Sequence, residues 1–474
     1  MSLLSNAKWN TFSQIFKILV QLINVVYLAK IIPPAEYGLM AMALVVINLG
    51  MLLRDLGTSS ALIKQKKLTD SLINTVFWLN TIMGVGLAIL VCTAAPLISS
   101  FYNQERLVSI LLSMSIIFPL SSCASAHMAL MQRESLFKKI SFIEVSSSFI
   151  SLLIALAFAK LGYGVYSLIF QAISLNALSA ILFWTLSKWK PNCKSLIVRK
   201  DIKEIFSFTK NVSIFNFVNY FSRNADSFII GKAMSSVILG SYNLAYRIML
   251  FPIQNLTYIA TRSLYPVLSQ YQDDNIRISN IYMRCTYFIL FVSAPLMMGL
   301  AILSKPFIFF VFGPQWYITG DVLKWLAPTG ILQSILSTTG AVFMAKNRTD
   351  LLLRLGLLGA ILQVGAFLIG AKYNIDIFVK LYFISNLINF FPAMYLVFNI
   401  LDSSLLLFFK KITPILLSVL FMSLGILYFE NLIKLSTSFN DFLALIVIGS
   451  VIYLSSMAIL SSELRSFFIK RKHR

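Results

Sequence analysis

The stretch EYGLMAMALVVINLG, residues 36–50, follows a Pro33-Pro34 turn and begins a long apolar run. About 20 mostly apolar residues are enough for a helix to span the hydrocarbon core of a bilayer. A related stretch, GSYNLAYRIMLFPIQ, begins at residue 240 and also opens an apolar helix with tyrosine and glycine. The two stretches predict membrane-spanning helices and indicate two copies of one unit.

The whole chain has the composition of a membrane protein. Of its 474 residues, 58% are hydrophobic and 12% are charged, about half of the ~25% charged residues typical of soluble proteins. The net charge is +22, a value that a nucleic-acid-binding protein also shows. Here the basic residues lie mainly in short segments between apolar runs, which favours charge facing the cytoplasm. We therefore expect the lipid bilayer as a partner and no nucleic acid.

Fourteen apolar runs are long enough to span a membrane, and their side chains do not alternate as those of membrane β-strands do. The predicted fold class is an all-α integral membrane protein with about 14 transmembrane helices. The runs start near Thr11, Gly38, Ile73, Leu107, Ile140, Gly164, Asn211, Tyr242, Cys285, Asp321, Leu352, Ile377, Lys411 and Asp441.

Alternate loops differ in their number of basic residues, and this difference predicts the orientation of the chain in the membrane. Of the 40 Lys and Arg residues, 26 lie in one set of loops, nine in the other and five inside spans. The richer set faces the cytoplasm, so both termini are expected there. The two repeated units predict an N-terminal six-helix lobe at 1–187, a basic cytoplasmic linker at 188–210 and a second six-helix lobe at 211–400. Two additional helices and a basic tail follow at 401–474.

Charged residues inside the spans are the candidate functional residues, because each costs about 2.5–3.5 kcal/mol at a helix centre on insertion scales. In NYFSRNADSFIIGK, residues 219–232, Arg223 and Asp226 lie three positions apart, a spacing that places them on one helix face. Two further arginines, Arg247 and Arg262, have no acid within four residues. The second span adds the adjacent pair Arg54 and Asp55.

These charges have two explanations. In the first explanation, which is purely structural, Arg223 pairs with Asp226 and Arg54 pairs with Asp55. These ion pairs would hold helices together. Against it, the four intramembrane arginines outnumber their candidate acids, which are Asp55, Asp226 and Glu144. A guanidinium group stays charged when desolvated and binds phosphate through two hydrogen bonds. The excess therefore favours a water-accessible cavity that receives an anion such as a diphosphate headgroup.

Other chemistry has no support in the sequence. The chain contains no GxxxxGK[ST] phosphate-binding loop, so we do not expect an ATPase. No metal site, zinc spacing or catalytic nucleophile constellation is found, and the four scattered cysteines predict no disulfide framework. We expect no bound cofactor.

Several segments resemble the Wzx-type polysaccharide flippases of the multidrug/oligosaccharidyl-lipid/polysaccharide exporter superfamily. They are RDLGTSSALIKQKK (54–67), NTVFWLN (74–80), DSFIIGK (226–232) and LGSYNLAYRIMLFP (239–252). The resemblance covers most of the chain. It implies two six-helix lobes around a central cavity, two C-terminal helices and alternating access.

The cargo implied by this resemblance is an undecaprenyl-diphosphate-linked oligosaccharide repeat unit of O-antigen, capsule or exopolysaccharide. It moves from the cytoplasmic to the periplasmic leaflet of a bacterial inner membrane, beside glycan polymerase and chain-length machinery. Substrate contact is expected from Arg223, Arg247, Arg262 and Arg54. Asp226 and Asp55 are expected to pair with these charges or to couple transport to a proton or sodium gradient.

Three other functions remain open. An exporter of drugs or small metabolites would need an acid-dominated cavity, which the arginines disfavour. A membrane glycan polymerase or ligase would need a sizeable outer loop with catalytic residues, and every outer loop is short. A structural assembly subunit would not bind the diphosphate lipid.

Overall fold

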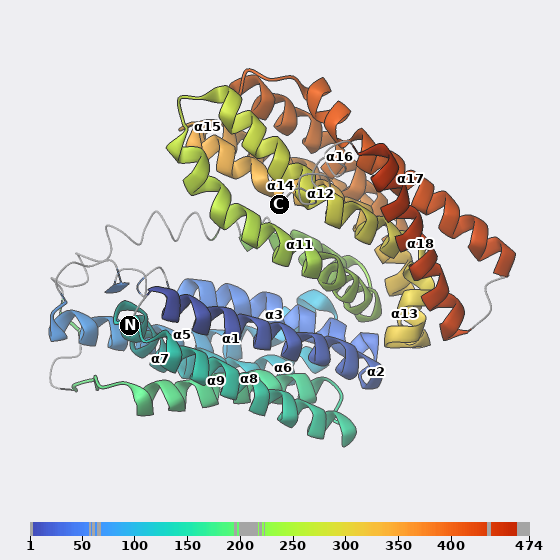
Figure 1. Ribbon diagram of the computed structural model, residues 1–474. Helices are drawn as coiled ribbons and strands as arrows, with labels where there is room; N and C mark the ends of the chain where they lie inside the picture. Colours follow the sequence, from blue (N-terminus) through green and yellow to red (C-terminus); the bar gives the residue numbers. More distant parts are fainter. Residues whose placement is uncertain are drawn as a thin grey trace. The chain divides into compact units, whose positions relative to one another are not determined.

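The computed structural model describes residues 3–55, 68–193, 223–433 and 438–461, with isolated positions at 58, 62–63, 197–198, 217 and 220–221. Every regular element in this part of the chain is a helix, as the apolar runs predicted. Contacts between helices divide the chain into two compact units, Met1–Gly240 and Ser241–Arg474 (Figure 1). The lobe and linker boundaries stay a prediction, since residues 199–216 lie outside the described ones.

The first unit is a bundle of long helices. α1 (Leu3–Ile23) continues through a π-helical segment (Asn24–Leu28) into the short α2 (Ala29–Ile31). The remaining helices are α3 (Pro34–Asp55), α5 (Asp70–Tyr102), α6 (Arg106–Ser115), α7 (Ile117–Arg133), α8 (Phe137–Lys160) and α9 (Val165–Leu186). α8 packs on α1 and α9, and α7 packs on α5 and α9. Residues 223–233 are also helical.

A partly buried carboxylate joins the ends of three helices in this unit. Glu36, in the first turn of α3, accepts hydrogen bonds of 2.5 and 3.0 Å from the guanidinium of Arg106 at the start of α6. It also accepts a 2.9 Å hydrogen bond from the backbone N–H of Val165 at the start of α9. A carboxylate at helix N-termini is favoured by the helix dipole, so Glu36 fixes α3, α6 and α9 at one level.

The two related stretches of the sequence meet in the first unit through their glycines. A Cβ atom on Gly38 would lie 1.8 Å from the carbonyl oxygen of Ser236, and one on Gly240 would lie 2.0 Å from that of Pro34. No side chain larger than hydrogen fits either position at these distances. The first turns of α3 and α11 (Ser236–Gln270) therefore contact each other backbone to backbone.

The second unit takes in most of α11, which begins in the first unit. It continues with α12 (Asn275–Ile302), α13 (Ser304–Phe312), a 3-10 turn (Pro314–Trp316), α14 (Tyr317–Ala345), α15 (Thr349–Gly370), α16 (Ile375–Ile400), α17 (Leu405–Ile433) and α18 (Phe439–Leu460). α14 packs between α12 and α16, and α17 packs on α12 and α18. Their shared core contains fully buried side chains such as Tyr282, Phe343 and Phe398.

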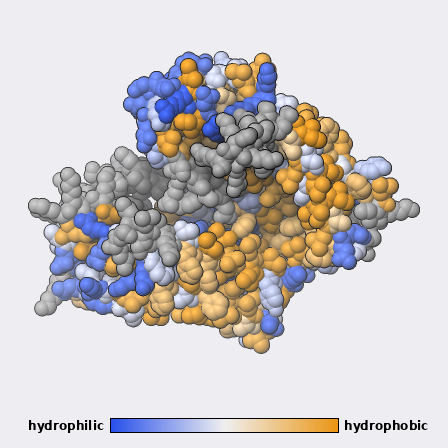
Figure 2. Space-filling model, viewed as in Figure 1, coloured by the Kyte–Doolittle hydropathy of each residue, from blue (hydrophilic) through white to orange (hydrophobic). Residues whose placement is uncertain are grey.

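Eleven helices of the described chain are long and apolar enough to cross a membrane. Their outer faces are apolar: Leu97 in α5 and Ile361 in α15 are 74% and 70% exposed. Figure 2 shows apolar residues gathered in broad areas of the face in view, with polar residues in separate areas. Apolar surface on this scale is suited to lipid. The chain is therefore a multi-pass membrane protein, and the count of fourteen spans stays a prediction.

Candidate functional site

Arg223 and Asp226 lie on one helix but in different surroundings. Asp226 is buried, with 6% of its surface exposed, and its Oδ1 accepts a 2.7 Å hydrogen bond from the backbone N–H of Ser227. Arg223 is exposed. None of the ion pairs among the described residues includes Arg223. The structure thus does not bring these two charges together as a neutral pair, and the guanidinium of Arg223 is accessible.

Arg247 lies on α11 and is also exposed. Asn243 and Gln254 lie four residues before it and seven after it, so the three fall within about 40° of arc on an ideal helix. Asn243 is visible beside Arg247 in the sequence, but Gln254 was not included in the predicted site because it lies beyond Pro252 in the apolar run. Arg262 also lies in α11, but its side chain is outside the described part of the chain.

Arg54 is the next-to-last residue of α3 and is half-buried, and Asp55 ends that helix. The side chain of Asp55 lies outside the described ones. Among the described residues, no group of three or more His, Cys, Asp or Glu side chains is placed to hold a metal ion.

The substrate and coupling roles of the six predicted site residues stay predictions.

A buried chain of hydrogen bonds follows the Arg54-Asp55 pair, and sequence reasoning missed it. The hydroxyl of Thr58 donates to Asn80 Oδ1 at 2.9 Å, and Asn80 Nδ2 donates to the hydroxyl of Ser125 at 3.1 Å. These bonds link Thr58, three positions after the end of α3, to α5 and α7. The signal was present in NTVFWLN, residues 74–80, where Asn80 is a polar residue deep in an apolar span. This chain of hydrogen bonds fixes the position of the C-terminal end of α3, which carries Arg54.

An ion pair in the first unit gives Glu144 a partner other than the arginines. Lys17 Nζ in α1 lies 2.8 Å from Glu144 Oε2 in α8, and both side chains are partly buried. The sequence had made Glu144 a candidate acid for the intramembrane arginines. The pair removes Glu144 from the candidate acids and Lys17 from the unpaired cations, so the net charge expected within the spans is unchanged.

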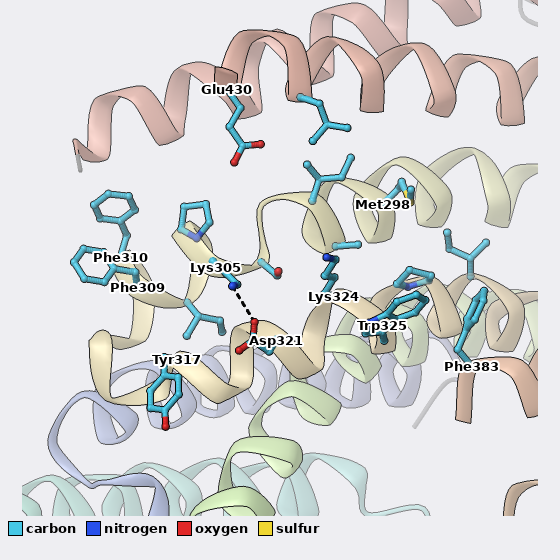
Figure 3. A pocket seen from close by; sticks show the side chains of 18 of the residues that line it. Met298, Lys305, Phe309, Phe310, Tyr317, Asp321, Lys324, Trp325, Phe383 and Glu430 are labelled. Atoms are coloured by element: carbon cyan, nitrogen blue, oxygen red, sulfur yellow. Dashed lines mark ion pairs between the residues drawn. The ribbon is translucent and has the colours of Figure 1, made fainter. Parts of the chain in front are cut away.

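The second unit contains a cavity of about 1220 Å³ between α12, α13, α14 and α17, with one side chain from α16. Aromatic and aliphatic residues form most of its wall, among them Phe309, Phe310, Trp325, Leu332 and Leu427. Four ionisable side chains also line it, Lys305, Asp321, Lys324 and Glu430, as Figure 3 shows. None of the predicted site residues whose side chains are described lines this cavity.

Comparison with known proteins agrees with the fold. The profile of a family described as "Polysaccharide biosynthesis protein" matches residues 27–319. Teichuronic acid biosynthesis protein TuaB of Bacillus subtilis (strain 168) is 29% identical over 92% of this chain and 89% of its own length. Lipopolysaccharide biosynthesis protein WzxC of Escherichia coli (strain K12) is 28% identical over 78% of this chain and 75% of its own.

Among solved structures, the lipid II flippase MurJ in an inward closed conformation has the same fold. The two structures superpose with a TM-score of 0.75, over 97% of this chain and 99% of that one. The sequences are 19% identical, so the likeness establishes the arrangement of helices.

Proposed function

Because the chain belongs to the family described as "Polysaccharide biosynthesis protein", we propose that it translocates a polyprenyl-diphosphate-linked oligosaccharide across a membrane by alternating access. The relatives named for teichuronic acid and lipopolysaccharide biosynthesis support a bacterial surface glycan as the cargo. A fold shared with a lipid II flippase supports movement of a lipid-linked saccharide rather than a covalent reaction. The protein is a transporter in this proposal and not an enzyme.

The proposed setting is a bacterial inner membrane, with fourteen spans and both termini in the cytoplasm. α11 has 35 residues and α14 has 29, so both are long enough to cross at about 1.5 Å per residue. With the segment at 211–232, they supply the three spans beyond the eleven apolar ones. Two six-helix lobes and two C-terminal helices complete the proposed architecture. Glycan polymerase and chain-length machinery are the proposed partners that receive the cargo.

The exposure of Arg223 and Arg247 is the observation that carries this proposal. On the proposed span at 211–232 and on α11, an exposed guanidinium group costs free energy unless water or an anion is nearby. We assign them to the diphosphate of the cargo, with Arg54 and Arg262 as further basic contacts. Asp226 is buried in the described part of the chain. We choose Asp226 before Asp55 for carrying a coupling proton or sodium ion.

Glycan export in cells tests this assignment. The variants are Arg223→Ala, Arg247→Ala and the double substitution, in a strain that lacks the native chain. Loss of one charged hydrogen-bonding partner reduces binding by about tenfold or more, so the double variant is expected to abolish export. Arg354→Ala is the matched control, because Arg354 is also an exposed arginine but lies within the first two turns of α15, near the end of its span. Normal export by the double variant at native expression would refute the assignment.

A further inference from the structure

The cavity of the second unit combines a large apolar volume with charges of both signs. Its volume of about 1220 Å³ exceeds the ~300–1,000 Å³ that is typical of small-molecule pockets. The apolar wall includes Met298, Phe309, Ile331, Phe383 and Leu427. A space of this size and lining suits a ligand with hydrocarbon chains. Because the outer faces of these helices are themselves apolar, such a ligand would come from the bilayer.

The charges within the cavity are arranged on two sides. Lys305 Nζ in α13 forms an ion pair with Asp321 Oδ1 in α14, at 3.1 Å. Lys324 extends from α14 on the same side, one turn after Asp321. Glu430 extends from α17 on the opposite side, and its carboxylate points toward the lysines (Figure 3). One wall of the cavity therefore carries two cations and one anion, with a net positive charge, and the facing wall carries the anionic Glu430.

Lys324 and Glu430 lack protein partners among the described residues. No hydrogen bond or ion pair joins either side chain to another described group. Glu430 is nevertheless partly buried among apolar side chains. A carboxylate in such a position is costly unless a cation or a hydrogen-bond donor meets it. A ligand that brings both a positive and a negative group would satisfy Glu430 and Lys324 together.

We propose that this cavity binds a zwitterionic phospholipid, phosphatidylethanolamine, with its phosphate on Lys324 and Lys305 and its ammonium group on Glu430. The acyl chains would lie against Phe309, Phe310 and the aliphatic wall. The primary ammonium donates hydrogen bonds to a carboxylate, which the quaternary ammonium of phosphatidylcholine does not. Phosphatidylglycerol carries the same phosphate but a neutral glycerol in place of the ammonium group, so it brings no cation to the carboxylate of Glu430.

This site is distinct from the proposed cargo site. A diphosphate lipid is strongly anionic and carries no cation, so Glu430 and Asp321 disfavour it. The bound phospholipid would instead join α17 to α12, α13 and α14 as a resident component of the second unit. The inference does not rest on the transport function, because it depends only on the lining of the cavity.

Native mass spectrometry of the full chain in a mild detergent tests the proposal directly. Phosphatidylethanolamine, phosphatidylglycerol and phosphatidylcholine with the same acyl chains are added in turn. Because the charged hydrogen bond to Glu430 is specific to one headgroup, phosphatidylethanolamine is expected to bind about tenfold more tightly than phosphatidylglycerol. Equal binding of the two lipids by the native chain would overturn the proposal.

Three variants separate the site from general lipid association. Glu430→Gln keeps the size of the side chain and is expected to remove the preference for phosphatidylethanolamine over phosphatidylglycerol. Lys324→Gln is expected to weaken binding of both lipids. Glu134→Gln is the matched control, since Glu134 is an exposed acid in the first unit. This variant should bind each phospholipid as the native chain does.

A preference unchanged in Glu430→Gln would contradict the assignment of the ammonium group. Displacement of the bound phospholipid by a polyprenyl diphosphate would also overturn the proposal, because the cavity would then belong to the cargo. If a charge variant does not fold, Leu332→Trp gives a second route. The larger side chain reduces the volume of the cavity without altering its charges, and it should reduce binding of all three phospholipids in parallel. Undiminished binding by that variant would place the lipid elsewhere.

Discussion

Replacing Gly240 by alanine should destabilise the protein, although alanine is the better helix former. The added Cβ would lie 2.0 Å from the carbonyl oxygen of Pro34 and 2.9 Å from the backbone nitrogen of Gly38. Ordinary van der Waals contact begins at 3.4 Å, so the two backbones must separate by about 1.4 Å. Both atoms belong to backbone, which cannot move aside as the end of a flexible side chain can.

The size and sign of the effect follow from this geometry. Overpacking a close contact costs typically ~1–3 kcal/mol, and we expect Gly240→Ala to lower the free energy of unfolding by at least about 2 kcal/mol. Gly86→Ala in α5 is the matched control, since nothing lies within 4 Å of its added Cβ. Without a clash, alanine should stabilise that helix by up to ~1 kcal/mol. Thermal unfolding in detergent measures both, and equal stability of the two variants would refute the backbone-to-backbone contact.

Two further substitutions test contacts inside the first unit, both by the same unfolding assay. Asn80→Ala removes hydrogen bonds to Thr58 and Ser125 and should cost about 1–3 kcal/mol, since each such bond in a membrane protein contributes ~0.6–1.7 kcal/mol. An Asn80→Ala variant with the same midpoint of thermal unfolding as the native chain would show that these hydrogen bonds are not formed. Lys17→Met leaves Glu144 unpaired and should destabilise by about 1 kcal/mol or more. Adding Glu144→Leu should restore stability, and a further loss in the double variant would argue against the pair.

The positions of most spans could be predicted from the sequence because hydropathy is a local property. Runs expected near Ile140, Gly164 and Ile377 correspond to helices that begin at Phe137, Val165 and Ile375. Breaks within a span were not predicted. The run near Leu107 is two helices that meet at Ile116, and the first span contains a π-helical segment. Hydropathy does not register such breaks, because the apolar composition continues through them.

Partners of charged residues could not be predicted, because they depend on how distant helices pack. Glu144 lies 127 positions from Lys17, and no local pattern connects them. The cavity of the second unit was missed for the same reason, since its four ionisable residues come from three helices. By contrast, the sequence placed Arg223 and Asp226 on one helix face, while the structure exposes the first and buries the second. A spacing of three residues spans about 60° of arc, enough to separate an exposed side chain from a buried one.

The central claim is that exposed arginines inside the membrane hold the anionic group of a lipid-linked saccharide. Translocation by purified protein in liposomes tests it most directly, with a polyprenyl-diphosphate oligosaccharide placed in one leaflet and its arrival in the other measured over time. The native chain and Arg354→Ala should move the lipid, whereas the variant carrying both Arg223→Ala and Arg247→Ala should bind and move it at least about tenfold less. Equal movement by that variant, or movement of the same lipid without its diphosphate, would contradict the account.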